Sequence, residues 1–472
     1  MRPNHRPVPS ALPHPTVLLV MIFSLAVLVA AVTVDMVNPV LHLIGEQWGA
    51  TKAQVSWVVS GVALVLAIGV PLYGRMSDFF ELKKLFAFAV SILSVGSLIC
   101  ALAPNLLSLV VGRMIQGAGM SAIPVLSVVA ISKVFPPGKR GGALGIIAGC
   151  IGVGTAGGPI FGGVVGQLFG WPYLFWITFI LSMVVAVCAL SLLPTFLPVR
   201  ETKKPRQFDL IGGALFGLAA GLLLLGVTQG ESVGFASFPS LGSLAGSLLS
   251  LSGFIWRIVT AENPFVPPVM FQNRHYVSSL IVAVFSMFAY FSVLVFVPLL
   301  VVEVNGLSPV QAGIVLLPGG AAVALLSPFV GRISDRLGTK RLILAGVAVM
   351  GASTLYLSTF ASGASPVWVS VGVWGAGIAF ALTNSPVNNA AVSALAKDQV
   401  GIRMGIFQGA LYLGAGVGAG MIGALLSARR EASRPLNPLY MLDAVSYSDA
   451  FLAAAFAVVI AFAAAFWLRK DR

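Results

Sequence analysis

Charged residues are scarce in this chain of 472 residues: only 9% are Asp, Glu, Lys or Arg, whereas 58% are hydrophobic. A soluble globular protein carries roughly a quarter charged residues. With so few charges the chain cannot cover a folded surface in water, so lipid must be the solvent over most of it. The composition therefore excludes a soluble protein and indicates a membrane protein.

Cysteine and histidine are also rare. The three cysteines, Cys100, Cys150 and Cys188, each lie in an apolar stretch and lack the spacing of a metal or redox site. No acidic pair has metal-ligand spacing, and no phosphate-binding Gly-Lys motif with Ser or Thr follows a strand. We therefore expect no enzyme, no metal and no cofactor. A nucleotide-driven pump is excluded within this chain, so active transport would need an ion gradient.

Long, continuously apolar runs fill the chain. Because they do not alternate in polarity, helices are the expected spanning form. The predicted fold class is an all-α polytopic membrane protein with fourteen transmembrane helices. The spans are expected at 16–44, 55–73, 85–103, 107–131, 140–168, 173–194, 209–228, 239–259, 276–302, 309–330, 341–360, 366–389, 401–427 and 450–468.

The positive residues indicate an orientation. Most of the 28 Lys and Arg residues fall in the tails or in connections that lie on one side of a fourteen-span chain. Lys52, Arg429, Arg430 and Arg434 fall on the other side, and Arg113 lies inside a span. Because basic residues collect in cytoplasmic loops, we expect both termini in the cytoplasm. The net charge of +13 is then an orientation signal, and no nucleic-acid partner is expected.

A charged stretch occurs twice, after the second and the tenth predicted spans, in short polar turns. Gly74, Arg75, Ser77, Asp78 and Lys83 recur with the same spacing as Gly331, Arg332, Ser334, Asp335 and Lys340. Such a repeat indicates a duplicated helical transporter, here with two spans inserted between its halves. The predicted divisions are a cytoplasmic tail (1–15), a six-helix bundle (16–194), a linker with two extra helices (195–275), a second six-helix bundle (276–468) and a short tail (469–472).

These turns resemble the loop between the second and third helices of major facilitator superfamily transporters, with the pattern Gly-x-x-x-Asp-Arg-x-Gly-Arg-Arg. The second copy follows it at Gly331, Asp335, Arg336, Gly338, Lys340 and Arg341; the first keeps Gly74, Asp78, Lys83 and Lys84, with Phe79 and Glu81 in place of Arg and Gly. We expect Asp78 and Asp335 to accept hydrogen bonds from helix N-termini, or to pair with Arg, when the transporter faces outward. The alternative is a solvated turn that only marks topology.

Two further stretches extend the resemblance to the fourteen-helix drug:proton antiporters, above all the tetracycline:proton antiporters. Residues 111–119 resemble the fourth-helix Arg-x-x-Gln-Gly motif, and residues 152–163 resemble the fifth-helix antiporter motif, with Gly154, Gly158, Pro159, Gly162 and Gly163. The resemblance implies a hinge that seals one side of a cavity; ordinary close packing of small residues is the alternative. Thr155 and Ala415 stand where the tetracycline pumps carry acidic residues.

Two charged residues fall within predicted spans, where a charge costs roughly 2.5–3.5 kcal/mol and usually has a task. Asp35 lies in the outer half of the first span, and Arg113 lies in the fourth with Gln116 on the same helix face. We interpret Asp35, Arg113 and Gln116 as a proton-coupling site. The alternatives are a polar cap near the outer interface for Asp35 and an ion-pair strut for Arg113.

Polar residues within other spans are candidates for the wall of a substrate cavity: Asn38, Tyr290, Asn384, Asn388, Gln408 and Tyr412. The preferred function is proton-coupled efflux of a lipophilic or cationic drug, by a monomer in the bacterial cytoplasmic membrane that works by alternating access. Uptake of a metabolite by symport, transport of a monovalent cation and a non-transporting receptor or scaffold stay open as alternatives.

Overall fold

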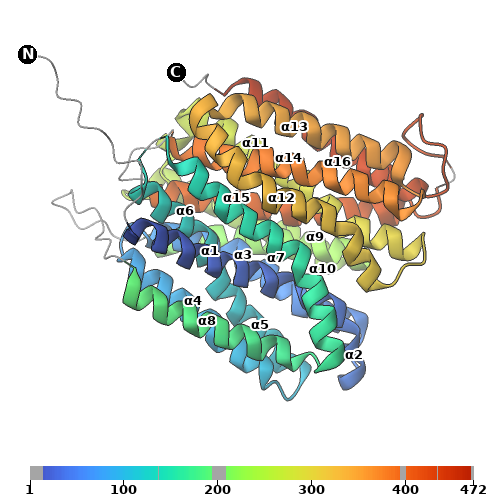
Figure 1. Ribbon diagram of the computed structural model, residues 1–472, viewed down its shortest axis with the longest axis horizontal. Coiled ribbons are helices and arrows are strands. Elements are labelled where there is room, and N and C mark those ends of the chain that lie inside the picture. Colours follow the sequence, from blue (N-terminus) through green and yellow to red (C-terminus); the bar gives the residue numbers. More distant parts are fainter. Residues whose placement is uncertain (1–13, 137, 194–208, 394–399, 433, 469–472) are drawn as a thin grey trace, which may run out of the picture.

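The computed structural model describes residues 14–136, 138–193, 209–393, 400–432 and 434–468. Every regular element in these ranges is a helix, and fourteen spans are long and apolar enough to cross a membrane. The helices lie side by side with their long axes roughly parallel (Figure 1). The expected linker 195–208, the tail 469–472 and residues 1–13 of the expected N-terminal tail lie outside the described residues.

The first half contains six spans. They are α1 (His14–Asp35), which is followed by the 3₁₀ turn η1 (Asn38–Val40) and α2 (Leu41–Trp48); α3 (Lys52–Met76); α4 (Leu82–Ala101); α5 (Leu106–Met120) with α6 (Ala122–Val134); α7 (Arg140–Leu168); and α8 (Pro172–Leu192). The inserted pair is α9 (Leu210–Val233) and α10 (Phe238–Thr260), followed by the 3₁₀ turn η2 (Pro268–Gln272).

The second half contains the other six. They are α11 (Arg274–Glu303), α12 (Pro309–Leu337), α13 (Thr339–Tyr356) with the π-helical turn η3 (Leu357–Ala361), α14 (Pro366–Ser393), α15 (Val400–Ala428) and α16 (Val445–Phe466). The prediction of an all-α protein with fourteen transmembrane helices is confirmed.

Prolines explain two breaks that the predicted spans did not contain. The first span breaks after Asp35, because Pro39 has no N–H and also disfavours helical geometry at Asn38. The fourth span is divided at Ser121 into α5 and α6, since Pro124 cannot donate to the carbonyl of Met120. The first of these breaks places a carboxylate at the end of a helix inside the membrane.

Two expected boundaries were wrong. The second charged motif is not a loop: Gly331, Asp335 and Arg336 lie in the last two turns of α12, which runs to Leu337 and ends at Gly338 with a φ of 83°. Glycine adopts such a positive φ without a steric cost, so the turn contracts to this one residue. The last span begins at Val445 rather than residue 450.

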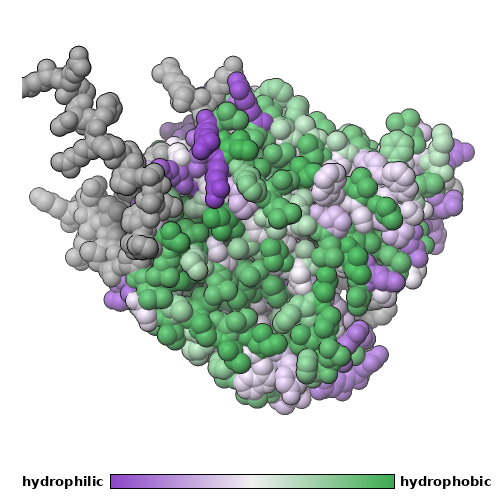
Figure 2. Space-filling view, viewed as in Figure 1, coloured by the Kyte–Doolittle hydropathy of each residue, from purple (hydrophilic) through white to green (hydrophobic). Residues whose placement is uncertain are grey.

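The two halves meet along two long seams. α7 packs along α12, and α3 packs along α15. α9 lies beside the second seam and contacts both α3 and α15, whereas α10 packs mainly on α9. The outer face of α10 exposes large apolar side chains, among them Leu249, Trp256 and Val259. Figure 2 shows a broad hydrophobic surface with hydrophilic residues gathered toward its ends, as expected for a molecule with lipid around its middle.

Asp209 fastens the start of the inserted helix pair. Its carboxylate accepts hydrogen bonds from the Gly212 amide (3.0 Å), the Phe265 amide (3.0 Å) and Arg257 Nε (3.1 Å). Burial acts to raise the pKa of Asp209, but these three donors outweigh it and hold the pKa below its ordinary value. The stabilisation is therefore complete at neutral pH and is lost only as the pH falls through that lowered pKa.

We expect Asp209→Asn to lower the stability of the protein by about 1–3 kcal/mol, because three buried or half-buried donors lose a charged acceptor. Thermal unfolding of the purified protein in detergent measures this. Glu262→Gln, an exposed acid in the connection after α10, is the matched control. Equal unfolding temperatures for both variants would contradict a fastening role for Asp209.

Candidate functional site

Both charged motifs lie at the same end of the helix bundle, which we call the turn side. The Asp335 carboxylate at the end of α12 accepts hydrogen bonds from the backbone amides of Gly141 (2.9 Å) and Gly142 (3.1 Å). These amides belong to the first turn of α7 in the other half, where helix N–H groups lack partners and the helix dipole favours negative charge. Asn389 Nδ2 on α14 adds a third contact at 3.3 Å.

Asp78 makes the corresponding contact in the opposite direction. Its Oδ2 accepts a hydrogen bond from the Ile402 amide (3.1 Å) in the first turn of α15, and Arg75 Nη1 lies 3.9 Å from the same oxygen. Both carboxylates therefore accept hydrogen bonds from helix N-termini in this structure, whereas their role in gating stays a prediction. Each half uses its charged motif to hold the start of a helix from the other half.

Glycines let the backbones approach at these contacts. A Cβ atom on Gly74 would overlap the backbone of Gly405, and a Cβ on Gly331 would overlap the carbonyl oxygen of Gly141. The motif glycines are thus required by the distance between the helices, not by an unusual φ. At the turn side the backbones of the two halves are therefore in direct contact at these two pairs of glycines.

The other predicted motif residues do not reach across the seam in the same way. Arg336 and Arg341 are exposed, and Lys83 is half-buried at the start of α4. Lys340 of the second motif donates hydrogen bonds of 2.6 Å to the carbonyls of Phe466 and Leu468. It therefore caps the end of α16, a stabilising role for a cation at a helix C-terminus.

Asp35 lies at the C-terminal end of α1, half-buried among helices of both halves. The Thr155 side chain on α7 hydrogen-bonds to its carboxylate, and Gly158 on the same helix packs directly against its Cβ. Arg113 of the first half and Tyr290 of the second half are both close enough to interact electrostatically with Asp35. The carboxylate thus faces the centre of the molecule, between the halves.

Arg113 is completely buried and holds three helices together. Its Nη1 donates to the Thr33 carbonyl on α1 (3.0 Å) and to Gln116 Oε1 (2.9 Å), and its Nε donates to the Val58 carbonyl on α3 (3.1 Å). Gln116 Nε2 in turn donates to Ser97 Oγ on α4 (2.7 Å). Arg113 Nη2 has no hydrogen-bond partner among the described residues. Arg113 therefore ties α1, α3 and α5 together and keeps one N–H group without a partner in the described part of the chain. Its contact on α1, Thr33, lies two residues before Asp35.

The glycines of α7 form two faces. Gly154, Gly158, Gly162 and Gly166 pack against α1 and η1, from Ala31 to Val40. Gly141, Gly145, Gly149 and Gly152 pack against α12 of the other half. Pro159 lies inside the helix, and Gly163 approaches Pro39 and Val310. The predicted antiporter motif therefore joins the Asp35 region to the seam between the halves.

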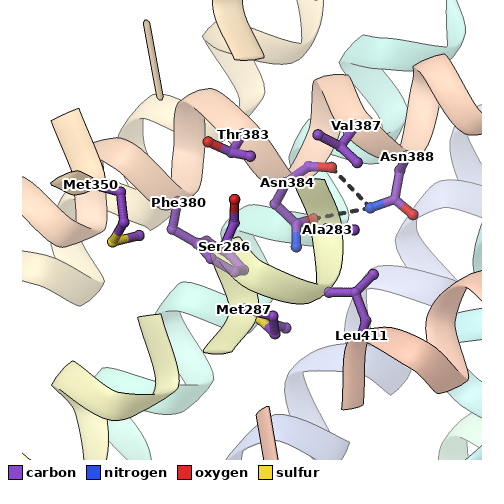
Figure 3. Close-up of a pocket in the computed structure, with 10 residues that line it drawn as sticks. All are labelled: Ala283, Ser286, Met287, Met350, Phe380, Thr383, Asn384, Val387, Asn388 and Leu411. Carbon is purple, nitrogen blue, oxygen red and sulfur yellow. Dashed lines mark hydrogen bonds between the residues drawn. The ribbon is translucent and has the colours of Figure 1, made fainter. Parts of the chain in front are cut away.

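Two adjoining cavities lie on the inside of the closed turn side. The α11–α14 cavity has a volume of about 310 Å³ and is lined by second-half residues only, as Figure 3 shows: Ala283, Ser286, Met287, Met350, Phe380, Thr383, Asn384, Val387, Asn388 and Leu411. The interhalf cavity, of about 450 Å³, is lined by Pro124, Val128, Leu144, Ile147, Ala148 and Ile151 of the first half and by Met287, Asn384, Asn388, Gln408 and Tyr412 of the second.

Four of the predicted cavity residues, Asn384, Asn388, Gln408 and Tyr412, line one or both cavities. Tyr290 lines neither, but its ring stacks on Phe380, which does, with centroids 4.2 Å apart. Asn38 is exposed near the break after α1 and lines neither cavity.

Sequence reasoning missed Ser286, Phe380 and Thr383 in the α11–α14 cavity; their spacing from Tyr290 and Asn384 along α11 and α14 was the available signal. It also missed Asp449, which lies in the second turn of α16, fully buried and paired with Arg429 Nη2 at 2.7 Å. Asp35 is therefore not the only carboxylate inside a span.

Comparison with known proteins places this architecture in a family. The sequence model of the Major Facilitator Superfamily matches residues 23–419. Multidrug resistance protein Stp of Mycobacterium tuberculosis is 29% identical over 84% of this chain and 73% of its own length. The tetracenomycin C resistance and export protein of Streptomyces glaucescens is 28% identical over 88% of this chain and 76% of its own length.

A solved structure, that of the human organic anion transporter MFSD10 (TETRAN), has the same fold: the TM-score is 0.71 at 12% identity, over 97% of this chain and all of that one. The chain belongs to the major facilitator superfamily. It is a multi-pass membrane transporter and not an enzyme.

We expect Gly331→Ala to open the turn side, because the added methyl group collides with the Gly141 carbonyl. Spin labels on the exposed positions 139 and 336, in a chain without other cysteines, report the separation of the halves. The distance distribution should gain a longer component. Gly157→Ala is the control, since a Cβ there meets nothing within 4 Å. Identical distributions for the two variants would show that the glycine contact does not hold the turn side closed.

Proposed function

We propose that the protein is a proton-coupled drug exporter that works by alternating access in the bacterial cytoplasmic membrane. Two bundles, residues 16–194 and 276–468, would rock about the cavities between them, with α9 and α10 outside this core. The names of two relatives, a multidrug resistance protein and a tetracenomycin C export protein, support efflux of a small organic molecule.

The observation that carries this proposal is the pair of reciprocal contacts on the turn side. A carboxylate at a helix N-terminus contributes about 0.3–1 kcal/mol when exposed and up to about 2 kcal/mol when partly buried. Such contacts are strong enough to favour one state and weak enough to break when the other state gains a ligand. They would close the turn side over the cavities in one half of the cycle.

We place the turn side in the cytoplasm. Lys83, Lys84, Arg336, Lys340 and Arg341 all lie at this end, and the positive-inside rule puts such residues on the cytoplasmic side. The cavities would then be closed to the cytoplasm and would release substrate outward.

Asp35 is the proposed proton carrier. Export against a gradient needs an energy input, and one charge moving through about 100 mV is worth roughly 2.3 kcal/mol. At about 1.4 kcal/mol per tenfold, this sustains on the order of a 40-fold substrate gradient. Arg113 contacts α1 at Thr33, two residues before Asp35, and its Nη2 has no hydrogen-bond partner among the described residues. This positive group would favour the deprotonated carboxylate when the cavity opens to the cytoplasm.

We expect Asp78→Asn to abolish export while expression stays intact. The amide can still accept a bond from Ile402, but it carries no charge for the start of α15, so the inward-open population grows. Drug accumulation in everted vesicles measures this. Asp443→Asn, an exposed acid in the connection before α16, should export as the wild type does. Normal export by Asp78→Asn would reduce the motif to a topology signal.

We expect Asp35→Asn to mimic the protonated state permanently. Adding drug to everted vesicles with an acidic interior should then no longer dissipate the pH gradient, although neutral drugs still bind. The control is Glu46→Gln, an exposed acid in the same span. If Asp35→Asn still collapses the pH gradient when drug is added, the proton passes through another group and Asp35 is at most a substrate contact.

A further inference from the structure

The amides that line the cavities form a chain of hydrogen bonds with a defined direction. Gln408 Nε2 on α15 donates to Asn388 Oδ1 (3.0 Å), and Asn388 Nδ2 donates to Asn384 Oδ1 (3.3 Å) and to its carbonyl (2.9 Å). Figure 3 shows the amide nitrogen of Asn384 turned away from Asn388. Among the described residues no acceptor bonds to this nitrogen, so the chain ends in an N–H₂ group that faces the α11–α14 cavity.

Ser286 supplies a second polar group without a partner in the same cavity, a hydroxyl. It is 8% exposed, its Oγ has no hydrogen-bond partner among the described residues, and it lines the α11–α14 cavity. Elsewhere on α11, Ser279 and Ser292 satisfy their hydroxyls by donating to carbonyls of their own helix, whereas the Ser278 hydroxyl has no partner among the described residues and lines neither cavity. A buried hydroxyl without a partner is costly, and Ser286 differs from the other unpartnered serines because it lines the cavity, where a ligand could complete its hydrogen bonding.

The rest of the wall is uncharged, and it is apolar apart from Thr383, whose hydroxyl donates to the Ala379 carbonyl. Met287, Met350, Phe380 and Leu411 line the same cavity, and none of the residues around either cavity carries a charge. An ion entering such a site would lose its hydration without gaining a counter-charge. Phe380 offers an aromatic surface, and the flexible methionines adapt to ligands of different outline.

From this geometry we propose that the α11–α14 cavity binds an uncharged aromatic molecule through a carbonyl oxygen. The oxygen accepts hydrogen bonds from Asn384 Nδ2 and Ser286 Oγ, and the ring system packs on Phe380 and the methionines. This inference rests on the proposed function at one point: the molecule that binds in the cavity is taken to be the exported substrate. It narrows the substrate from a lipophilic or cationic drug to a neutral ring system with a carbonyl edge.

Equilibrium binding to the purified full chain in detergent tests this with a matched pair of ligands. 2-(Hydroxymethyl)anthraquinone carries two ring carbonyls, whereas 2-(hydroxymethyl)anthracene has the same outline without them. We expect the wild type to bind the quinone more tightly than the anthracene, and more tightly than tetraphenylphosphonium, an apolar cation. Equal affinity for the two ring systems, tighter binding of the cation or no binding of the quinone would overturn the proposal.

The variant Ser286→Ala should weaken quinone binding about threefold to tenfold, the range expected for one hydrogen bond, and should leave anthracene binding unchanged. Ser278→Ala is the matched control: Ser278 lies two turns earlier on α11, is equally buried and has an unpartnered Oγ, but lines neither cavity. Asn384→Ala should weaken quinone binding as Ser286→Ala does, with the thermal unfolding of each variant measured alongside.

The same loss of quinone binding in Ser278→Ala as in Ser286→Ala would overturn the assignment of the hydroxyl. Because binding is measured without a proton gradient, the two proposals fail separately. Quinone-selective binding without drug-dependent proton flux would sink only the exporter hypothesis. Export with no preference for carbonyl-bearing ligands would sink only the cavity assignment.

Discussion

The reciprocal contacts between carboxylates and helix N-termini are the polar interaction that joins the two halves at the turn side. Asp335 holds the first turn of α7, and Asp78 holds the first turn of α15, so each half is tied to the other at two places. Neither tie is a salt bridge between two side chains. The partner is the backbone at the start of a helix, whose N–H groups have no other internal acceptor. The tie therefore costs little side-chain entropy to form and leaves unpaired amides when it breaks.

Glycine makes these ties possible, and the same requirement runs along the whole of α7. One face of this helix must approach α12 in the other half, while the next face must approach α1 around Asp35. A residue with a Cβ on either face would push a helix away. The seam between the halves and the surroundings of the carboxylate are thus set by one helix.

Asp449, Arg113 and Asp35 are charged residues within the spans, and they differ in the groups to which they hydrogen-bond. Asp449 is paired with Arg429 and also accepts the Leu436 amide at 2.7 Å, so it fastens the connection before α16. Arg113 donates to carbonyls on two other helices and is a strut in this state. Asp35 instead hydrogen-bonds to the side chain of Thr155, which carries no charge. A carboxylate without a bonded cation can change protonation without dismantling the fold.

The fold could be predicted well because the lengths of the apolar runs and the repeated charged turns can be read from the sequence without knowledge of tertiary contacts. The limits of α7, for instance, match the expected span 140–168. The sequence predicted less about where helices continue through polar residues: α12 extends through Asp335 because the carboxylate is satisfied by another helix, and α16 includes Asp449 because Arg429 pairs with it. The sequence around Asp335 does not contain the α7 amides that it contacts, and the sequence around Asp449 does not contain Arg429.

The cavity walls were predictable only in part, for a related reason. Asn384 and Asn388 are amides one turn apart in an apolar run, which is a visible signal. Ser286 lies one turn from Tyr290, but this spacing does not show whether its hydroxyl has a partner, because a serine in a membrane helix usually bonds to its own backbone, as Ser279 and Ser292 do. Whether a given serine is satisfied depends on the rotamer that its neighbours allow. The unpartnered state of its hydroxyl becomes apparent only in the folded chain.

In the proposed alternating-access cycle the inserted helix pair would have to allow the halves to move, although α9 contacts both. Gly217 and Gly221 of α9 meet Ile68 and Leu64 of α3, while Leu224 and Val227 meet Gly416 and Gly420 of α15. At each of these places a glycine on one helix receives an aliphatic side chain of the other. Such contacts are non-directional, so sliding along them sacrifices no hydrogen bond. α9 can then cover the seam between α3 and α15 from lipid throughout the cycle, while the polar ties that distinguish the two states remain on the turn side.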